Sequence, residues 1–157
     1  MNFWSSMLGK LITTFFISMV PVLELRGAVP IAYANGINIW MAVIVSIIGN
    51  MVPVPFIIVF IKKIFALIRK VSAKLDSLVK KLEDRAEKKS DVVQKYKFWG
   101  LFVLVAIPLP GTGAWTGALV AAMLDMRLKD AFWSILLGVI AAGIVVALAT
   151  CGVGALF

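Results

Sequence analysis

The sequence has no histidine and a single cysteine, Cys151, among its 157 residues. Without histidine, the imidazole-based acid–base pairs that many enzymes use cannot form, and one cysteine cannot make an internal disulfide. A metal site built from histidine and cysteine is excluded for the same reason. No other nucleophile–base pair and no phosphate loop ahead of a soluble helix stands out. We therefore predict a protein that is not an enzyme and holds no cofactor.

Charge is also scarce, because only 15% of the residues are charged while 62% are hydrophobic. Soluble domains average about a quarter charged residues and about half apolar ones. Several apolar runs approach or exceed the roughly 20 residues that a membrane-spanning helix needs. The composition therefore predicts an all-α integral membrane protein.

The few charges are unevenly placed, and most of the formal net charge of +8 lies in residues 62–97, which hold 12 basic and 5 acidic residues. A basic block beside apolar spans is typical of a cytoplasmic segment facing lipid headgroups, so we expect no nucleic acid partner. Its apolar residues recur at alternating spacings of four and three, which predicts an amphipathic helix. Whether it lies on the membrane, pairs as a short coiled coil or packs on its own protein stays open. The stripe consists of Ile64, Ile68, Val71, Leu75, Leu78 and Leu82.

Residues 1–61 form a first unit, in which a short apolar arm precedes prolines, glycine and charge. The arm, residues 11–22, would cover about 18 Å as a helix, roughly half of a bilayer core. We therefore predict a re-entrant hairpin over residues 11–35, closed by a turn at Asn35. A transmembrane span should follow over residues 37–61, kinked by Pro53 and Pro55.

Residues 98–157 repeat the same order of parts, with a predicted re-entrant hairpin over 98–124 and a span over 131–157. Pro21 corresponds to Pro108 at a spacing of 87, and Gly49 corresponds to Gly138 at a spacing of 89. The competing interpretation is four straight crossings, since each hairpin segment is also long enough to span.

If the hairpins are re-entrant, the two repeats are inverted, and residues 62–97 join them on the cytoplasmic side. The turn that carries Arg127 and Lys129 is then cytoplasmic too, as the positive-inside tendency requires. Inverted repeats with broken helices are typical of transporters. We expect a multi-pass protein of the inner membrane, and a homodimer, because so few elements enclose little volume.

The two breaks, residues 21–30 and 108–117, form the candidate site. Ionisable residues at membrane depth indicate a function by default. Arg26 could hold a phosphate or carboxylate, with backbone N–H groups at Gly27, Gly111, Thr112 and Gly113. Glu24 is the candidate coupling residue, binding a proton or Na⁺. In the alternative, Glu24 and Arg26 only neutralise each other and pin the elbow shut.

The remaining candidate residues are expected to shape these breaks rather than touch a substrate. A buried asparagine in a membrane helix is more often interhelical glue than a ligand. These residues are Pro21, Pro30, Pro108, Pro110, Trp115 and Asn50.

The stretches ELRGAVP, residues 24–30, and PLPGTGAWTG, residues 108–117, resemble the motifs of the putative small multidrug export protein family. The resemblance extends over nearly the whole chain. More distantly, Arg26 with Pro30 and the Pro108 motif are similar to the paired motifs of the DedA and VTT-domain superfamily, here in the opposite order. That similarity implies opposed re-entrant hairpins and the flipping of polyprenyl phosphate or other lipids.

Our first hypothesis is an ion-coupled transporter of an anionic lipid carrier such as undecaprenyl phosphate. The alternative is a small multidrug exporter of lipophilic cations that uses Glu24, although Arg26 two residues away would repel a cation. A third hypothesis is a membrane scaffold that acts through the 62–97 helix.

Overall fold

The computed structural model describes residues 6–71, 73–88, 96–109 and 111–154; residues 1–5, 72, 89–95, 110 and 155–157 lie outside the described part. Regular structure within those described ranges is helical throughout, as the sequence predicts. Two stretches are long and apolar enough to cross a membrane, Ile39–Leu67 and Leu128–Val153.

The chain begins with a helical hairpin made of α1 (Met7–Met19) and α2 (Glu24–Ala34). Residues 20–23 form the turn between the two helices. The hairpin therefore lies where the sequence predicts one, and its second helix begins at Glu24. The ELRGAVP motif forms the first two turns of a helix and not an irregular elbow.

The first long apolar stretch consists of α3 (Ile39–Met51) and α4 (Pro53–Val71). Asn38 caps its start by accepting a hydrogen bond from the Trp40 N–H at 3.0 Å. The helix is interrupted at Val52, next to Pro53, because proline has no N–H to continue the backbone ladder. The predicted kink is thus confirmed, and the apolar stretch runs further than the predicted end at residue 61.

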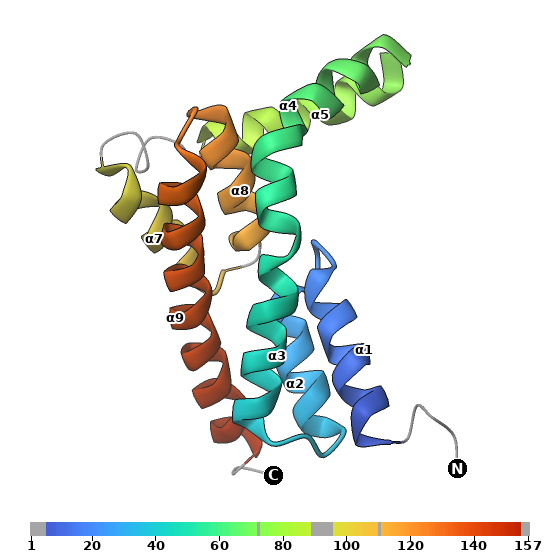
Figure 1. The fold of residues 1–157 in the computed structure, drawn as a ribbon, viewed down its shortest axis with the longest axis vertical. Helices are drawn as coiled ribbons and strands as arrows, with labels where there is room; N and C mark the ends of the chain where they lie inside the picture. The colour runs from blue at the N-terminus through green and yellow to red at the C-terminus, as the bar shows by residue number, and fades with distance from the viewer. Residues whose placement is uncertain (1–5, 72, 89–95, 110, 155–157) are drawn as a thin grey trace.

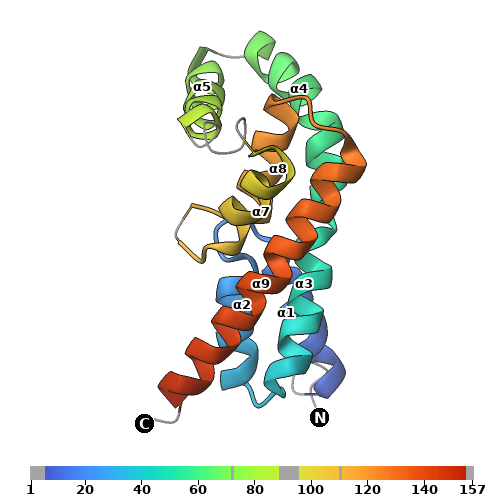
Figure 2. The ribbon, with the colours of Figure 1, turned by 90° about the vertical axis from the view of Figure 1, so that its left-hand side faces the viewer.

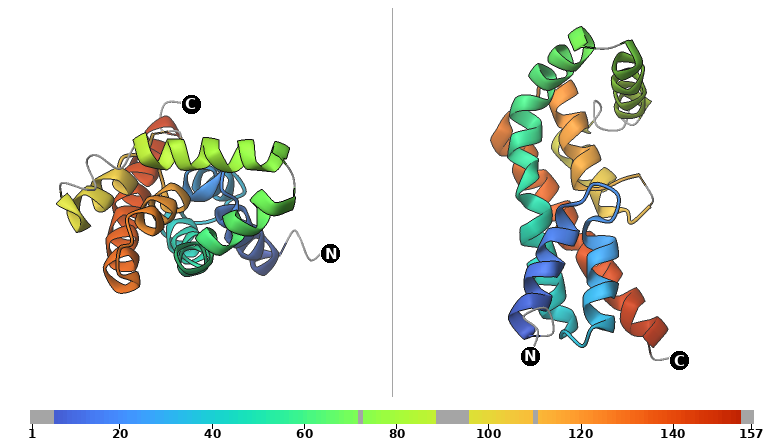
Figure 3. Two further views of the ribbon diagram at one scale, coloured as in Figure 1. Left: turned by 90° about the horizontal axis from the view of Figure 1, so that it is seen from above. Right: turned by 90° about the vertical axis from the view of Figure 1, so that its right-hand side faces the viewer.

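The basic segment departs from the predicted single helix. It is divided between the end of α4 and a separate helix, α5 (Ala73–Lys88), which contacts α4 and α8 (Figures 2 and 3). Of the predicted apolar stripe, Ile64 and Leu78 are exposed, whereas the neighbouring Phe65 and Val79 are buried. Because α5 folds back against α4 and α8, the described side chains that are buried there are not those of the predicted stripe. The other four stripe side chains lie outside the described ones.

The second half holds another hairpin, α7 (Phe98–Ala106) and α8 (Ala114–Met123), joined by residues 107–113. A turn then leads into α9 (Leu128–Gly154), which starts three residues before the predicted span. Lys62 in α4 pairs with Asp125 in this turn at 2.6 Å. The turn after α8 therefore lies at the same end of the molecule as the start of the basic segment.

The two hairpins point at each other from opposite ends of the molecule (Figure 1). The α1–α2 hairpin lies beside α3, the α7–α8 hairpin lies beside the upper part of α9, and α9 runs from the turn after α8 to the opposite end of the molecule. The turn at 20–23 and the segment 107–113 meet near mid-height (Figure 3). Helix α2 contacts α3 and α9, while α8 contacts α4 and α9.

The aligned glycines make equivalent contacts in the two halves. A Cβ on Gly49 would collide with the backbone oxygen of Phe15 and with the Ser18 side chain, both in α1. A Cβ on Gly138 would lie 3.0 Å from the backbone oxygen of Phe102 and 2.7 Å from Val105 Cβ, both in α7. Phe15 and Phe102 are 87 residues apart, the same spacing that relates the two prolines. Each long helix therefore packs closely on the first arm of its own hairpin.

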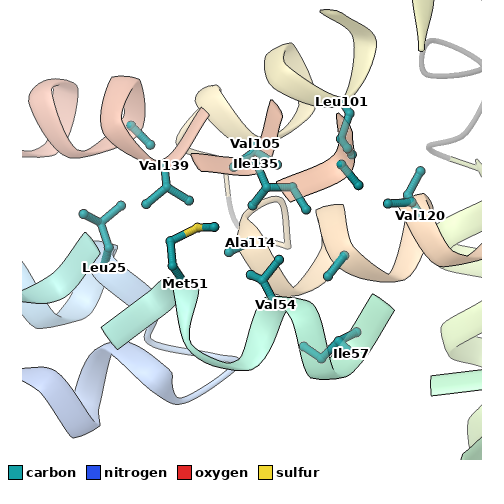
Figure 4. Close-up of a cluster of buried hydrophobic side chains, with 14 of the residues drawn as sticks. Leu25, Met51, Val54, Ile57, Leu101, Val105, Ala114, Val120, Ile135 and Val139 are labelled. Atoms are coloured by element: carbon teal, nitrogen blue, oxygen red, sulfur yellow. The ribbon is translucent and has the colours of Figure 1, made fainter. Parts of the chain in front are cut away.

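The core sits where the halves join, and Leu25, Met51, Val54, Ala114 and Val139 meet there (Figure 4). Outside this core the surface is unusually apolar. Large apolar side chains are exposed along every described helix except α8. A contiguous apolar surface of this kind is what lipid, rather than water, would cover.

Candidate functional site

The site is built where the turn before α2 meets the segment before α8. Glu24 opens α2 with a φ of 48°, a left-handed conformation that residues other than glycine rarely adopt. Its side chain is only 5% exposed and reaches the start of α8, where the Trp115 N–H donates to Oε1 at 3.2 Å. A carboxylate at a helix N-terminus is stabilised by the helix dipole and the unpaired N–H groups. Glu24 thus occupies the place where we expected an anionic substrate.

Arg26 makes the reciprocal connection, because its guanidinium donates to carbonyl oxygens of the other half. Nη1 donates to the carbonyls of Leu109 and Thr112, and Nη2 donates to the Ile107 carbonyl at 3.1 Å. Nη2 also donates to Thr112 Oγ1 at 3.0 Å. The terminal N–H groups that were expected to grip a phosphate are therefore engaged by protein oxygens.

Among the described residues Glu24 and Arg26 form no ion pair with each other, and in place of the direct pairing of the alternative hypothesis each makes a connection to the other half. We call the pair of connections the latch: Glu24 to the start of α8, and Arg26 to residues 107–112. Charge-assisted hydrogen bonds contribute about 1.5–3 kcal/mol each, so the latch holds the halves together strongly.

Trp115 adds a further connection across the same junction. Its indole Nε1–H donates to the Met19 carbonyl at the end of α1, at 3.1 Å. Because its backbone N–H also donates to Glu24, Trp115 forms hydrogen bonds at both ends of the turn between α1 and α2. The sequence assigned Trp115 to packing and gave no signal for either hydrogen bond.

Gly113 is placed so that only glycine fits. Its φ of 146° and ψ of −168° lie in a region that is essentially restricted to glycine. A Cβ on this residue would overlap the Glu24 carboxylate. Gly113 therefore does belong to the site, because it lets a carboxylate approach the helix N-terminus.

Other predicted site residues have different roles. Gly27 is not an open anion site, because its N–H donates to the Leu23 carbonyl at 2.9 Å within the first turn of α2. Gly111 accepts a hydrogen bond from Thr116 through its carbonyl. Pro21 lies in the first turn and Pro108 in the second break, as expected, whereas Pro30 lies inside α2. Pro110 lies outside the described residues.

An open, apolar pocket of about 430 Å³ borders the latch. Arg26 is the only charged residue among those of the described part that line it, and Pro30 and Pro108 form one wall. The opposite wall comes from the last turns of α9. The α9 residues are Val145, Val146, Ala149, Thr150 and Val153.

Asn50 differs from its expected role as interhelical glue. Its side chain is 1% exposed, and neither its oxygen nor its nitrogen has a hydrogen-bond partner. Ser46, one turn earlier on α3, is also fully buried with an unpartnered hydroxyl. Sequence reasoning missed Ser46, although its spacing of four from Asn50 places both on one helical face.

Comparison with known proteins adds one finding. A sequence model of the family described as "Putative small multi-drug export protein" matches residues 24–145, which include the ELRGAVP motif, the whole second break and most of both long helices. No curated protein and no solved structure matches the chain. The distant similarity to the DedA and VTT-domain superfamily therefore receives no support.

Proposed function

The chain belongs to the putative small multi-drug export protein family, and from that premise we propose that it is an inner-membrane exporter of small lipophilic compounds. The family and the two long apolar helices together indicate a membrane protein. The observation that carries the mechanism is the latch, because it closes the molecule at the point where the two hairpins meet.

In the proposed arrangement the hairpins are re-entrant and the long helices cross the bilayer. The 27 residues of α9 would extend about 40 Å, enough to cross with some tilt. Trp40 lies in the first turn of α3 at one end of the molecule, whereas Trp99 and Trp133 lie near the starts of α7 and α9 at the other. All three are more than half exposed, as expected of side chains at the two membrane interfaces.

The charges assign the orientation in this proposal. The end of the molecule that holds the start of the basic segment and the start of α9 carries Lys62, Lys97 and Arg127. By the positive-inside tendency, that end is cytoplasmic. The Lys62–Asp125 pair supports hairpins over four straight crossings, because straight crossings would put the two residues on opposite sides. Lys10 is the described basic residue nearest the other end.

The proposed repeats are supported by contacts as well as by spacing. Helix α1 packs on α3 as α7 packs on α9, while α2 packs on α9 as α8 packs on α4. Exchanging the halves thus preserves the pattern of contacts. Inverted repeats that meet near the midplane permit alternating access by rocking one half against the other.

Opening a passage between the hairpins requires that the latch be released. A proton on Glu24 would remove the charge that favours its place at the N-terminus of α8. The bond to Trp115 would weaken, and Arg26 would remain as the charged part of the latch. Protonation from one side and release to the other would couple transport to the proton gradient.

The pocket beside the latch is the proposed substrate site. Its walls are apolar except for Arg26 and Thr150, which suits a compound that enters from the lipid phase. Arg26 disfavours a cation there, so we propose neutral or singly negative lipophiles rather than the lipophilic cations of the sequence-based alternative. The polyprenyl phosphate hypothesis is not supported, because Arg26 and the N–H groups of Gly27 and Thr112, which it proposed as phosphate ligands, are engaged within the protein. The homodimer stays a prediction.

The binding test uses two probe ions of the same shape and opposite charge, tetraphenylborate and tetraphenylphosphonium, with purified protein in detergent. We expect the anion to bind at least tenfold more tightly, which corresponds to about 1.4 kcal/mol. Ala149→Trp should fill the pocket and abolish binding. Leu148→Trp is the matched control, because Leu148 is 65% exposed and does not line the pocket.

Transport is tested in liposomes that contain the protein and a trapped pH-sensitive dye, pyranine. Adding a bound substrate should drive proton movement with the wild type and not with Glu24→Gln. Substrate-dependent proton flux that persists in Glu24→Gln would contradict the coupling mechanism. Equal binding to both tryptophan variants would contradict the assignment of the pocket.

A further inference from the structure

The interiors of the two halves differ in polarity at equivalent positions. In the first half, Thr14 and Ser18 of α1 and Ser46 and Asn50 of α3 are buried. At the spacings of 87 and 89, the second half has Leu101, Val105, Ile135 and Val139 in these places. These four aliphatic side chains are also buried. The four polar residues, which we call the seam, thus correspond to four aliphatic side chains in the other half.

The seam lies between α1 and α3 and leads toward the latch. Gly49 packs against Ser18 and is followed by Asn50, so Ser18 of α1 and Asn50 of α3 lie at about the same height along the two helices. Glu24 lies close to this end of the seam, because its N–H donates to the carbonyl of Val20, the residue that follows α1. At the other end Lys10 donates to the Asn35 carbonyl at 2.7 Å on the surface. Lys10, Thr14 and Ser18 recur every four residues and so share one side of α1.

On α3 the seam faces α2. Gly49 packs on α1, whereas Val43 is the α3 residue nearest Gly143 of α9. At about 100° per residue, Ser46 and Asn50 lie on the face between these two directions. Helix α2, which begins with Glu24, contacts α1, α3 and α9 and therefore lies opposite that face.

The unpartnered atoms indicate what occupies the seam. Asn50 needs an acceptor for its nitrogen and a donor for its oxygen, and Ser46 can use either. A cation can satisfy the oxygens but not the amide N–H groups, whereas water satisfies both. Leaving such groups dry would cost about 1–3 kcal/mol each. Buried water is the usual partner of buried polar groups that lack one in the protein.

We propose that this seam holds a chain of water molecules that carries protons between Glu24 and the end of the molecule where Lys10 and Asn35 lie. Along it a hydronium ion passes its proton from water to water, and the Glu24 carboxylate takes the proton to become a carboxylic acid, leaving neutral water. Arg26 is the charged group near Glu24. Among the buried described residues, α1, α3 and α8 present no charged side chain to it. The proposal rests on Glu24 being the coupling group.

The first test is independent of transport and uses single cysteines in a Cys151→Ser background. Ser46→Cys and Asn50→Cys are exposed to Ag⁺, which reaches a thiol only through water, and remaining thiols are counted with maleimide after denaturation. Ile135→Cys and Val139→Cys are the matched controls at the equivalent apolar positions. We expect Ag⁺ to block the two seam thiols at least tenfold faster. Equal rates would overturn the proposal, and the near-isosteric Ser46→Cys protects the test against misfolding of the other variant.

The second test measures proton flux in the pyranine liposomes. Ser46→Val and Asn50→Leu should reduce substrate-driven flux at least tenfold while tetraphenylborate binding stays unchanged. Unchanged flux would contradict the proton pathway even if the seam is wet. If wild-type protein shows no substrate-driven flux at all, the exporter proposal fails, whereas the Ag⁺ rates still decide whether the seam holds water.

Discussion

Replacing Gly113 by alanine tests the latch directly. The native φ of 146° disfavours any residue with a Cβ, and the new methyl group would overlap the Glu24 carboxylate. The backbone strain costs about 1–3 kcal/mol, and loss of the charge-assisted bond to α8 about 1.5–3 kcal/mol, together on the order of 2.5–6 kcal/mol. This is a large part of the 5–15 kcal/mol that typically stabilises a folded protein.

The matched control is Gly36→Ala. Gly36 also has a positive φ, 80°, but a Cβ there would meet nothing within 4 Å. Only the left-handed backbone is penalised in this variant, at about 1–2 kcal/mol. Equilibrium unfolding by SDS in mixed micelles, followed by circular dichroism, gives the free energy of unfolding for both variants.

A double-mutant cycle with Glu24→Ala isolates the contact between Gly113 and Glu24. Once the carboxylate is gone, Gly113→Ala has nothing to displace, and its cost should fall to the backbone strain alone. The expected coupling is about 1.5–3 kcal/mol. Additive free energies, or a cost for Gly113→Ala no greater than that for Gly36→Ala, would refute the latch.

The remaining predictions concern packing and charge. Gly138→Ala should destabilise the protein by about 1–3 kcal/mol in the same unfolding assay through overpacking against α7, while Gly152→Ala, which meets nothing within 4 Å, should be neutral. Thr112→Val should cost about 1 kcal/mol, since it removes one acceptor of Arg26 and keeps the side-chain shape. Lys62→Ala should change stability by less than about 1 kcal/mol, because its ion pair is exposed; a larger loss would mean that this pair, and not the latch, ties the two halves together.

Local patterns allowed much of the fold to be predicted from the sequence. Apolar runs and the positions of Pro53 and Asn35 located both hairpins and both long helices, since helix breaks and turns depend on residues close in sequence. The basic segment was harder. A stripe of spacing four and three identifies an amphipathic helix, but which face is buried depends on what α5 folds back against, and only Phe65 and Val79 reveal it.

For the candidate site, too, some features follow from the sequence and others only from the tertiary structure. The sequence by itself singled out the residues that meet in the structure, because Glu24 and Arg26 stand out as charges in an apolar half and Gly113 stands out in a glycine-rich break. Only the tertiary structure decided what they bind. Arg26 and Glu24 lie more than 80 residues from their partners in the other half, and a contact at that separation is fixed by how two hairpins meet in space. For that reason Arg26, which looked in the sequence like a ligand for a phosphate, instead donates to carbonyl oxygens and the Thr112 hydroxyl of the other half.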